Sequence, residues 1–368
     1  MMLTLRTRSH PGGMMPLCSL DEALEDLSSG KFVIVVDDEG RENEGDLFYF
    51  ADRMTPEAIT FMVTHARGLV CVAMQGDRLD ELQIPNLRSR NSNSTQPTAF
   101  TRSVDYKPGT TTGISAHDRS ATIRALVDAK SQPTDFIQPG HMFPLRAHPG
   151  GVLIRQGHTE AVVDMASLAG AYPAGVVCEI MNEDGTMSRL PDLEIFAAKH
   201  DIKIFSIAQL IAHRCNTETL ITRVAEANLP TKYGAARIIG YRSAIDTGEH
   251  AALVVGEWQA GDEVLVRVHS ECLTGDAFGS LKCDCGEQLD MAIRMIFENG
   301  AGALVYLRQE GRGIGLHNKI KAYALQDDGL DTIEANVALG FQPDERKYDL
   351  AVQIMRDLEI SRARLVTK

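Results

Sequence analysis

The sequence predicts a protein of two domains, an α/β sandwich followed by an α+β domain. Its 368 residues are more than one ordinary domain holds. Strand and helix signals alternate over the first half, whereas in the second half strands come first and helices follow. The pattern breaks in a polar stretch around 214–218, so we expect domains over 17–215 and 216–368.

The first half is expected to build a sheet from apolar, β-branched runs separated by helices. Residues 86–113 are rich in Asn, Ser, Thr and Gly and predict a long loop, a kind of segment that often carries function. Ser115 and Thr159 are predicted helix N-caps. Strands are expected over 31–36, 69–74, 176–181 and 202–206, and helices over 56–66, 118–129, from within 157–160, and over 191–200.

The second half shows the same signals in a different order. Strands are expected at about 220–225, 235–241, 251–257 and 264–269, and helices over 286–297, 314–326, 333–339 and 348–358. Residues 1–16 contain no acidic side chain and no apolar core. We expect them to form a disordered tail, with Met14 or Met15 as an alternative start.

Charge and cysteine content restrict the function classes. The chain carries 37 basic and 50 acidic side chains, a net charge of −13, and no long apolar run. These features argue against a nucleic-acid binder and against a membrane protein. Four of the seven cysteines are scattered and three are clustered, which is not a disulfide framework. We therefore expect a cytoplasmic protein that acts on small molecules.

An acidic run suggests a first site. Residues 37–46 hold six carboxylates in ten positions, directly after an expected buried strand. Mg²⁺ prefers such oxygen ligands, although a solvated acidic turn is the commoner use of this pattern. Two further segments carry chemistry: His141 lies between glycine and an apolar run, and Arg155 and His158 flank a helix start that could seat a phosphate.

Segments 37–46, 109–119, 139–146, 150–160 and 174–179 together resemble 3,4-dihydroxy-2-butanone 4-phosphate synthase of riboflavin biosynthesis, over residues 17–213. The resemblance implies conversion of ribulose 5-phosphate to the four-carbon phosphate and formate, with two Mg²⁺ or Mn²⁺ ions per site. It implies that Glu42 and His158 bind the metal and that His141 and Glu179 are essential to turnover. The implied substrate-binding residues are Arg41, Glu42, Asp46, Arg155, Gln156, Gly157, His158, Thr159 and Glu179, with Thr111, Thr112 and His117 at the border of the site.

Glu179 ends an apolar run, 176–180. A carboxylate in that position is expected to be partly desolvated, which suits a general base. The alternative is a strand-edge charge that points into solvent.

A cysteine cluster suggests a second site. Cys272, Cys283 and Cys285 follow the spacing Cys-x10-Cys-x-Cys. Three thiolates without a fourth indicate zinc with an open position, which lowers the pKa of bound water to about 7. The alternatives are a closed structural site completed by His269, or three free thiols. The glycine-spaced basic loop 308–316 could approach a phosphate, but this spacing alone is weak evidence.

From Leu220 to the last residue the chain resembles GTP cyclohydrolase II, including segments 322–326, 331–336 and 344–346. The whole chain thus resembles bifunctional riboflavin biosynthesis proteins, and a homodimer is implied. The resemblance implies one zinc on Cys272, Cys283 and Cys285, Asp344 as proton acceptor, Arg346 as nucleophile, and Tyr323 near the base. The implied GTP-binding residues are Arg267, Val268, His269, Ser270, Glu271, Gln288, Glu310, Gly311, Arg312, Thr332 and Thr367.

Two alternatives stay open for this half. The commoner use of a tripeptide such as 344–346 is a helix N-cap with a first-turn charge pair. The family continues past Thr367 into a segment with a GTP-binding lysine, whereas this sequence stops at Lys368, so we expect a C-terminally truncated domain. The runner-up function is accordingly an active synthase whose C-terminal half is a zinc-stabilised regulatory or nucleotide-binding module.

Overall fold

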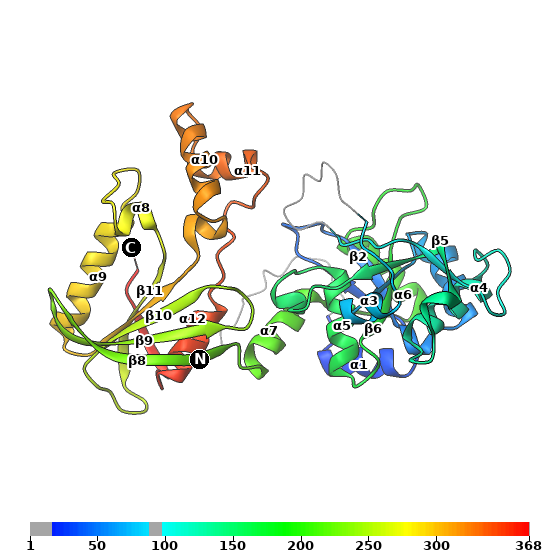
Figure 1. The fold of residues 1–368 in the computed structure, drawn as a ribbon, viewed down its shortest axis with the longest axis horizontal. Helices are drawn as coiled ribbons and strands as arrows, with labels where there is room; N and C mark the ends of the chain where they lie inside the picture. The colour runs from blue at the N-terminus through cyan, green and yellow to red at the C-terminus, as the bar shows by residue number, and fades with distance from the viewer. Residues whose placement is uncertain (1–16, 88–97, 368) are drawn as a thin grey trace. The chain divides into compact units, whose positions relative to one another are not determined.

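The computed structural model describes residues 17–87 and 98–367 (Figure 1). The expected tail 1–16 and part of the expected loop lie outside these ranges. The described residues form two compact units that divide between Asn216 and Thr217. None of the described helices is long and apolar enough to cross a membrane.

The first unit is built on a mixed seven-stranded sheet with the strand order β4-β5-β3-β6-β2-β1-β7. Its strands are β1 (Val33–Val36), β2 (Gly45–Phe50), β3 (Cys71–Met74), β4 (Val104–Tyr106), β5 (Phe136–Arg146), β6 (Ala174–Glu179) and β7 (Lys203–Ser206). Its helices are α1 (Leu20–Ser28), α2 (Pro56–Phe61, continued as a π-helical turn over Met62–Ala66), α3 (Gly76–Glu81), α4 (Ala116–Val127), α5 (His158–Leu168), α6 (Leu190–His200) and α7 (Ile207–Thr217). Short 3₁₀ turns cover Ala51–Arg53, Pro133–Asp135 and Gly151–Leu153.

Helices cover both faces of this sheet because its central strands are apolar on both sides. Ile34 and Leu47 face a core shared with α2, α4 and α6, whereas Val35 and Phe48 face a core shared with α1, α5 and α7. Side chains alternate between faces along each strand, so one strand serves both cores. The expected α/β sandwich is confirmed, with three layers.

Strand register brings residues far apart in the sequence into one row. Asp46 on β2 pairs with Val35 on one side and with Glu179 on the other. β3 lies between β6 and β5. Cys71 of β3 pairs with Val177 of β6 and with Phe143 of β5, so Glu179 and His141 each lie two residues beyond these partners, toward the same end of the sheet. The row therefore lines up Asp46, Glu179 and His141 at one end of the sheet.

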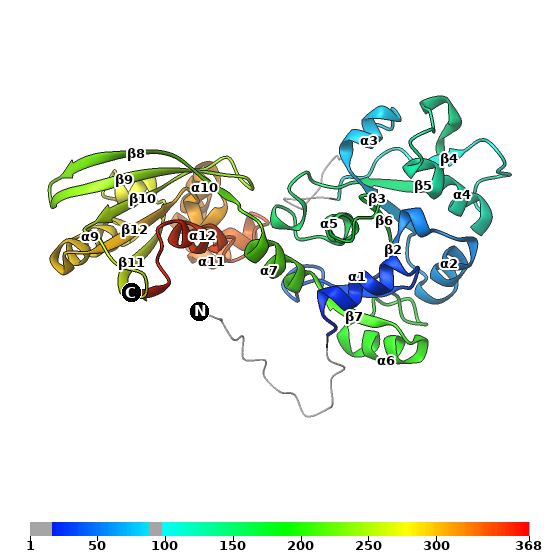
Figure 2. The same ribbon diagram turned by 90° about the horizontal axis from the view of Figure 1, so that it is seen from below.

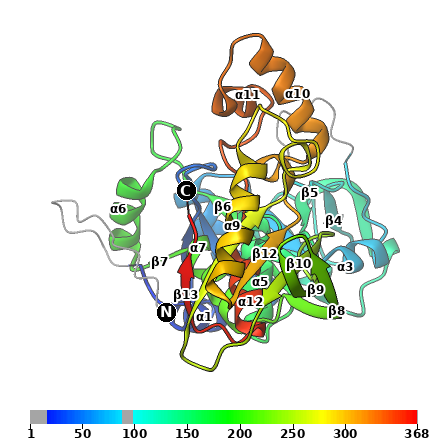
Figure 3. The ribbon, with the colours of Figure 1, turned by 90° about the vertical axis from the view of Figure 1, so that its left-hand side faces the viewer.

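The second unit has a six-stranded sheet in the order β13-β11-β12-β10-β9-β8, of which β8, β9 and β10 form a long curved antiparallel ribbon (Figure 2). Its strands are β8 (Ile221–Thr231), β9 (Gly234–Ser243), β10 (Glu249–Val255), β11 (Glu263–Ser270), β12 (Gly302–Leu307) and β13 (Arg362–Leu365). Its helices are α8 (Leu273–Asp276), α9 (Cys285–Asn299), α10 (Leu316–Asp327), α11 (Thr332–Ala338) and α12 (Asp349–Asp357), with a 3₁₀ turn over Glu310–Gly313. Figure 3 shows α9 running along the sheet, where its apolar side packs on β11 and β12.

The α+β class of this unit is confirmed, but several local predictions are wrong. The order of strands first and helices after fails because β12 and β13 follow α9 and α12. In the first unit β2, β5, α1, α3 and α7 were not expected, and β4 lies inside the expected long loop. Ser115 does cap α4, but Gly157 rather than Thr159 is the N-cap of α5, so Thr159 is already helical.

Candidate active sites

The acidic turn after β1 is organised by Asp37. Its Oδ1 accepts a hydrogen bond from Glu44 N (2.8 Å), and its Oδ2 accepts from Glu42 N (3.1 Å) and from Arg41 Nη1 (2.8 Å). The same Arg41 nitrogen donates to Glu42 Oε2 at 2.7 Å. The Asp37 carboxylate thus fixes the turn, and the guanidinium of Arg41 reduces the repulsion between the carboxylates of Asp37 and Glu42.

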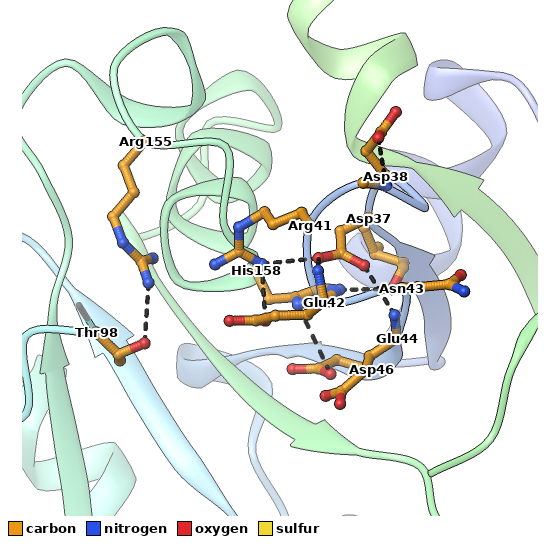
Figure 4. Close-up of polar contacts among 12 residues, drawn as sticks. Asp37, Asp38, Arg41, Glu42, Asn43, Glu44, Asp46, Thr98, Arg155 and His158 are labelled. Atoms are coloured by element: carbon orange, nitrogen blue, oxygen red, sulfur yellow. Dashed lines mark hydrogen bonds and ion pairs between the residues drawn. The ribbon is translucent and has the colours of Figure 1, made fainter. Parts of the chain in front are cut away.

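This turn meets the start of α5 and forms a group of potential metal ligands. One donor atom each from Asp37, Glu42 and His158 lies within 4.8 Å of the other two. Figure 4 shows these side chains converging, with Asp46 beside them. Glu42 and His158 were predicted as ligands, whereas Asp37 was seen only as part of the acidic run. Because residues 37 and 158 lie far apart in the sequence, the sequence alone does not predict this contact.

The protonation of His158 fits a ligand role. His158 is 7% exposed, and burial lowers its pKa to about 4, so the ring is neutral at pH 7. Its Nε2 lies 3.1 Å from Val35 O, and a carbonyl can only accept, so Nε2 carries the proton. Nδ1 therefore keeps its lone pair, the state required for binding a cation.

Asp46 is the buried acid of the row. It is 4% exposed, and its Oδ1 lacks a hydrogen-bond partner among the described residues, although it lies 3.8 Å from His158 Nδ1. Burial and the nearby Glu179 and Glu44 raise the pKa of Asp46 well above its usual range. A buried acceptor without a donor needs an explanation, and a bound cation or a substrate hydroxyl would supply the missing contact.

Glu179 is held beside Asp46 by the backbone of the residues that precede β3. Its Oε2 accepts a hydrogen bond from Leu69 N at 2.9 Å, and the residue is half-buried. A side chain at Gly68 would overlap the backbone and the carboxylate of Glu179. The carboxylate is therefore packed against the main chain and does not extend freely from a strand edge, the alternative that the sequence left open.

His141 has a carboxylate partner that the sequence did not indicate. Asp105 Oδ2 lies 2.7 Å from His141 Nδ1, and Asp105 Oδ1 accepts from His141 N at 2.8 Å. A side chain at Gly113 would overlap both groups. The loop before α4 is fixed by Asp118, which accepts hydrogen bonds from Thr111 and from Gly113 N. Only strand pairing between β4 and β5 brings Asp105 to His141.

The predicted phosphate seat differs from the expectation. Arg155 is 8% exposed and donates to Glu160 Oε2 (2.6 Å) and to Thr98 Oγ1 (2.9 Å), so it points away from the acidic turn (Figure 4). Gln156 is exposed, and Gly157 and Thr159 are buried at the first turn of α5. The structure brings the helix start to the site, but not the guanidinium of Arg155.

In the second unit the three predicted thiols converge. One sulfur from each of Cys272, Cys283 and Cys285 lies within 4.8 Å of the others, and the first two sulfurs are 3.5 Å apart. Burial and the neighbouring thiolates raise the pKa of Cys285. Burial acts in the same direction on Cys272, but hydrogen bonds from Lys319, the Gly275 backbone and neighbouring side chains together lower the pKa of this thiol. Three thiolates this close repel one another unless a cation lies among them, so the group fits a divalent ion.

A cavity of about 750 Å³ opens beside the thiols. Its size is typical of a site for a ligand as large as a nucleotide. Every residue that the sequence predicted to contact GTP lines it, together with Tyr323 and Arg346; these are Arg267, Val268, His269, Ser270, Glu271, Gln288, Glu310, Gly311, Arg312, Thr332 and Thr367. Gly311 and Arg312 have left-handed backbones (φ 63° and 59°), a strained conformation for an arginine.

Asp344 and Arg346 form a forked pair outside any helix. Arg346 Nε donates to both carboxylate oxygens of Asp344 (2.8 and 3.1 Å), and Nη2 donates at 2.5 Å. α12 begins only at Asp349, so the alternative of a helix N-cap is wrong. Asp344 does not line the cavity itself, although its partner does.

The two units match two different families. The family profile of 3,4-dihydroxy-2-butanone 4-phosphate synthase matches residues 21–213, and that of GTP cyclohydrolase II matches residues 222–368. Riboflavin biosynthesis protein RibBA of Bacillus mycoides (strain KBAB4) is 56% identical over 348 residues, which cover 95% of this chain and 87% of that protein.

The chain belongs to the RibBA family.

RibBA of Aquifex aeolicus (strain VF5) is 53% identical over 352 residues, which are 95% of this chain and 86% of that protein. This RibBA-family chain is thus a bifunctional enzyme of riboflavin biosynthesis, with a lyase domain and a hydrolase domain. Both family assignments made from the sequence are confirmed.

Solved structures agree with this family assignment. RibBX, described as a two-domain 3,4-dihydroxy-2-butanone 4-phosphate synthase from A. baumannii, has a TM-score of 0.76 and 38% identity, covering 95% of this chain and 94% of that chain. A 3,4-dihydroxy-2-butanone 4-phosphate synthase in complex with two magnesium ions has a TM-score of 0.51 and 40% identity, covering 54% of this chain and 98% of that chain.

Proposed function

We propose that the first unit converts ribulose 5-phosphate with the residues gathered at the end of its sheet. The convergence of Asp37, Glu42 and His158 beside Asp46 is the observation that carries this proposal. Two Mg²⁺ or Mn²⁺ ions held by Glu42 and His158 would offset negative charge on the oxygens of the enediol form of the sugar. The neutral ring of His158, the unpartnered Asp46 oxygen and the magnesium-bound relative support such a site.

His141 and Glu179 are proposed to move the protons of this reaction. In a neutral ring whose Nδ1–H donates to Asp105, Nε2 has a free lone pair that can take a proton from carbon or oxygen. Glu179 supplies a half-buried carboxylate between His141 and Asp46 in the strand order of the sheet. The charge of Arg155 is offset by Glu160. The sugar phosphate would therefore be attracted mainly by the N-terminus of α5, over residues 157–159.

For the second unit we propose a zinc site on Cys272, Cys283 and Cys285 and GTP in the adjoining cavity. A zinc ion with three protein ligands supplies hydroxide at neutral pH for opening the imidazole ring of guanine. Arg346 lines the same cavity and is the proposed nucleophile toward the α-phosphate. Asp344, which already accepts hydrogen bonds from that guanidinium, would receive its proton.

Turnover of both substrates by the full chain tests these assignments. With Mg²⁺, ribulose 5-phosphate should yield formate, and with Zn²⁺, GTP should yield formate and pyrophosphate. Zinc binding with tight GTP binding but without turnover would instead favour the second candidate, a synthase with a zinc-stabilised nucleotide-binding half. The two-domain relative described only as a synthase gives that candidate its specific support.

We further propose domain limits of 17–215 and 216–368, a cytoplasmic location and a homodimer. Within the described residues, Cys18, Cys71, Cys178, Cys272, Cys283 and Cys285 form no disulfide, a state typical of a reducing compartment. The homodimer rests on the family resemblance, and light scattering on the purified chain tests it.

A further inference from the structure

Lys319 is a buried lysine for which the sequence indicated no role. It lies on α10 and is 9% exposed. Its Nζ is 3.0 Å from Cys272 Sγ and 2.7 Å from Glu310 Oε1. A buried lysine paired with a carboxylate is usually a structural ion pair. Contact with a sulfur of the thiol group at the same time distinguishes this lysine from that ordinary case.

The carboxylate that faces Lys319 ties two segments together. Glu310 Oε1 also accepts a hydrogen bond from Gly311 N (2.8 Å), and its Oε2 accepts from Leu273 N (2.6 Å). Glu310 therefore connects the strained turn Glu310–Gly313 with the residue that follows Cys272. Although Glu310 was predicted to bind GTP, both oxygens of its carboxylate are engaged within the protein.

The connection continues to the proposed nucleophile. Arg312 O accepts a hydrogen bond from Glu345 N at 2.9 Å. A side chain at Gly313 would overlap Glu345, so the two backbones are closely packed. Glu345 stands between Asp344 and Arg346, which places the forked pair at the end of a continuous path from Cys272.

We propose that Lys319 is a positioning residue of the cyclohydrolase half, which fixes the Cys272 sulfur and, through Glu310, the turn Glu310–Gly313. This inference rests on the proposed zinc and GTP sites. Three thiolates and Glu310 carry four negative charges, of which a divalent ion and Lys319 offset three. A hydrogen bond from the ammonium to one thiolate also withdraws electron density from that ligand, so the metal keeps more of its positive character.

Metal binding to the full chain gives a test that does not depend on turnover. Lys319→Met keeps the length of the side chain and removes its charge, whereas Lys319→Arg keeps the charge. Lys321→Met is the matched control, because Lys321 is exposed on the same helix. Competition with a chromophoric chelator should show zinc affinity 10–100-fold weaker in Lys319→Met, and within a few-fold of wild type in Lys319→Arg and Lys321→Met.

Cobalt absorption reports on the sulfur contact itself. Loss of the hydrogen bond raises the energy of the Cys272 sulfur lone pair, so the thiolate-to-cobalt charge-transfer band should move to longer wavelength in Lys319→Met. The band should stay in place in Lys321→Met. With saturating zinc, the KM for GTP should rise about tenfold in Lys319→Met, because the turn Glu310–Gly313 loses its anchor.

The double variant Lys319→Met with Glu310→Gln is a control for the case in which Lys319→Met alone unfolds the protein. It removes the carboxylate that the single substitution would leave buried without a counter-ion. The cobalt band of this variant should still lie at longer wavelength than that of Glu310→Gln alone. Equal zinc affinity, cobalt absorption and KM in wild type and Lys319→Met would overturn this inference alone. Absence of zinc binding by the wild-type chain would overturn it together with the proposed zinc site.

Discussion

At the scale of single residues, Glu179 carries the sharpest prediction for the synthase. Glu179→Gln keeps the shape of the side chain and its hydrogen bond from Leu69 N, but it removes the base. We expect formate release from ribulose 5-phosphate to fall by about 10²–10⁴-fold. Glu183→Gln, at an exposed glutamate nearby, should leave the rate unchanged. Full turnover by a folded Glu179→Gln protein would contradict the assigned role.

Asp105 carries a second prediction at this scale. Asp105→Asn replaces the acceptor of His141 Nδ1–H by an amide that can donate, so the ring is expected to take the other tautomer. We expect kcat for ribulose 5-phosphate to fall by about 10²–10⁴-fold while KM changes little. Steady-state kinetics of the synthase reaction measure both constants, and an unchanged kcat would exclude His141 as a base oriented by this carboxylate.

At the scale of elements, the segment before β3 sets the position of Glu179. A methyl group at residue 68 would overlap Glu179, so Gly68→Ala should destabilise the fold by about 1–3 kcal/mol and lower the synthase rate about 100-fold. Gly170→Ala is the control: its φ of 69° makes a side chain costly by about 1 kcal/mol, but nothing lies within 4 Å. Urea unfolding and formate release separate the two effects. Equal rates in both variants would show that residue 68 does not position Glu179.

The loop before α4 should depend on pH through Asp118. A hydrogen bond from Thr111 and others from the loop lower the pKa of Asp118 to about 2, below its ordinary value. The stabilisation is therefore complete above about pH 4 and is lost as the pH falls toward 2, because the unfolded chain binds the proton first. Asp118→Asn should have a lower urea midpoint than wild type at pH 7, and the difference should vanish near pH 2. A difference that stayed constant with pH would contradict this account.

The elements that the sequence predicted well are those with strong local signals. Val33–Val36 and the helix capped by Ser115 follow from an apolar run and an N-cap. β5 was missed because its eleven residues include two prolines, one glycine and exposed positions, and so lack the alternation of a half-buried strand. Motif spacing brought together the thiols, and the family resemblance brought together the cavity residues. Asp105 and Lys319 carry no motif, and only strand pairing or helix packing places them at their sites.

At the scale of the whole molecule, the two proposed metal sites should respond to different treatments. A zinc-selective chelator should abolish GTP turnover, whereas ribulose 5-phosphate turnover should persist when Mg²⁺ is present in excess. Cys283→Ser should give the same selective loss, with GTP turnover reduced by at least about 100-fold. Parallel assays of both reactions on one preparation measure this. Loss of both activities on chelation would contradict two independent sites.

Asp46 and Glu179 face each other only in one alignment of β2 against β6. Because side chains alternate along a strand, sliding either strand by a single position would send one of the two acids to the opposite side of the layer. Deleting one residue within Ala174–Glu179 should therefore silence the lyase even where the protein stays compact. Recovery of formate production after denaturation would consequently report how many molecules had reassembled that sheet in its native alignment.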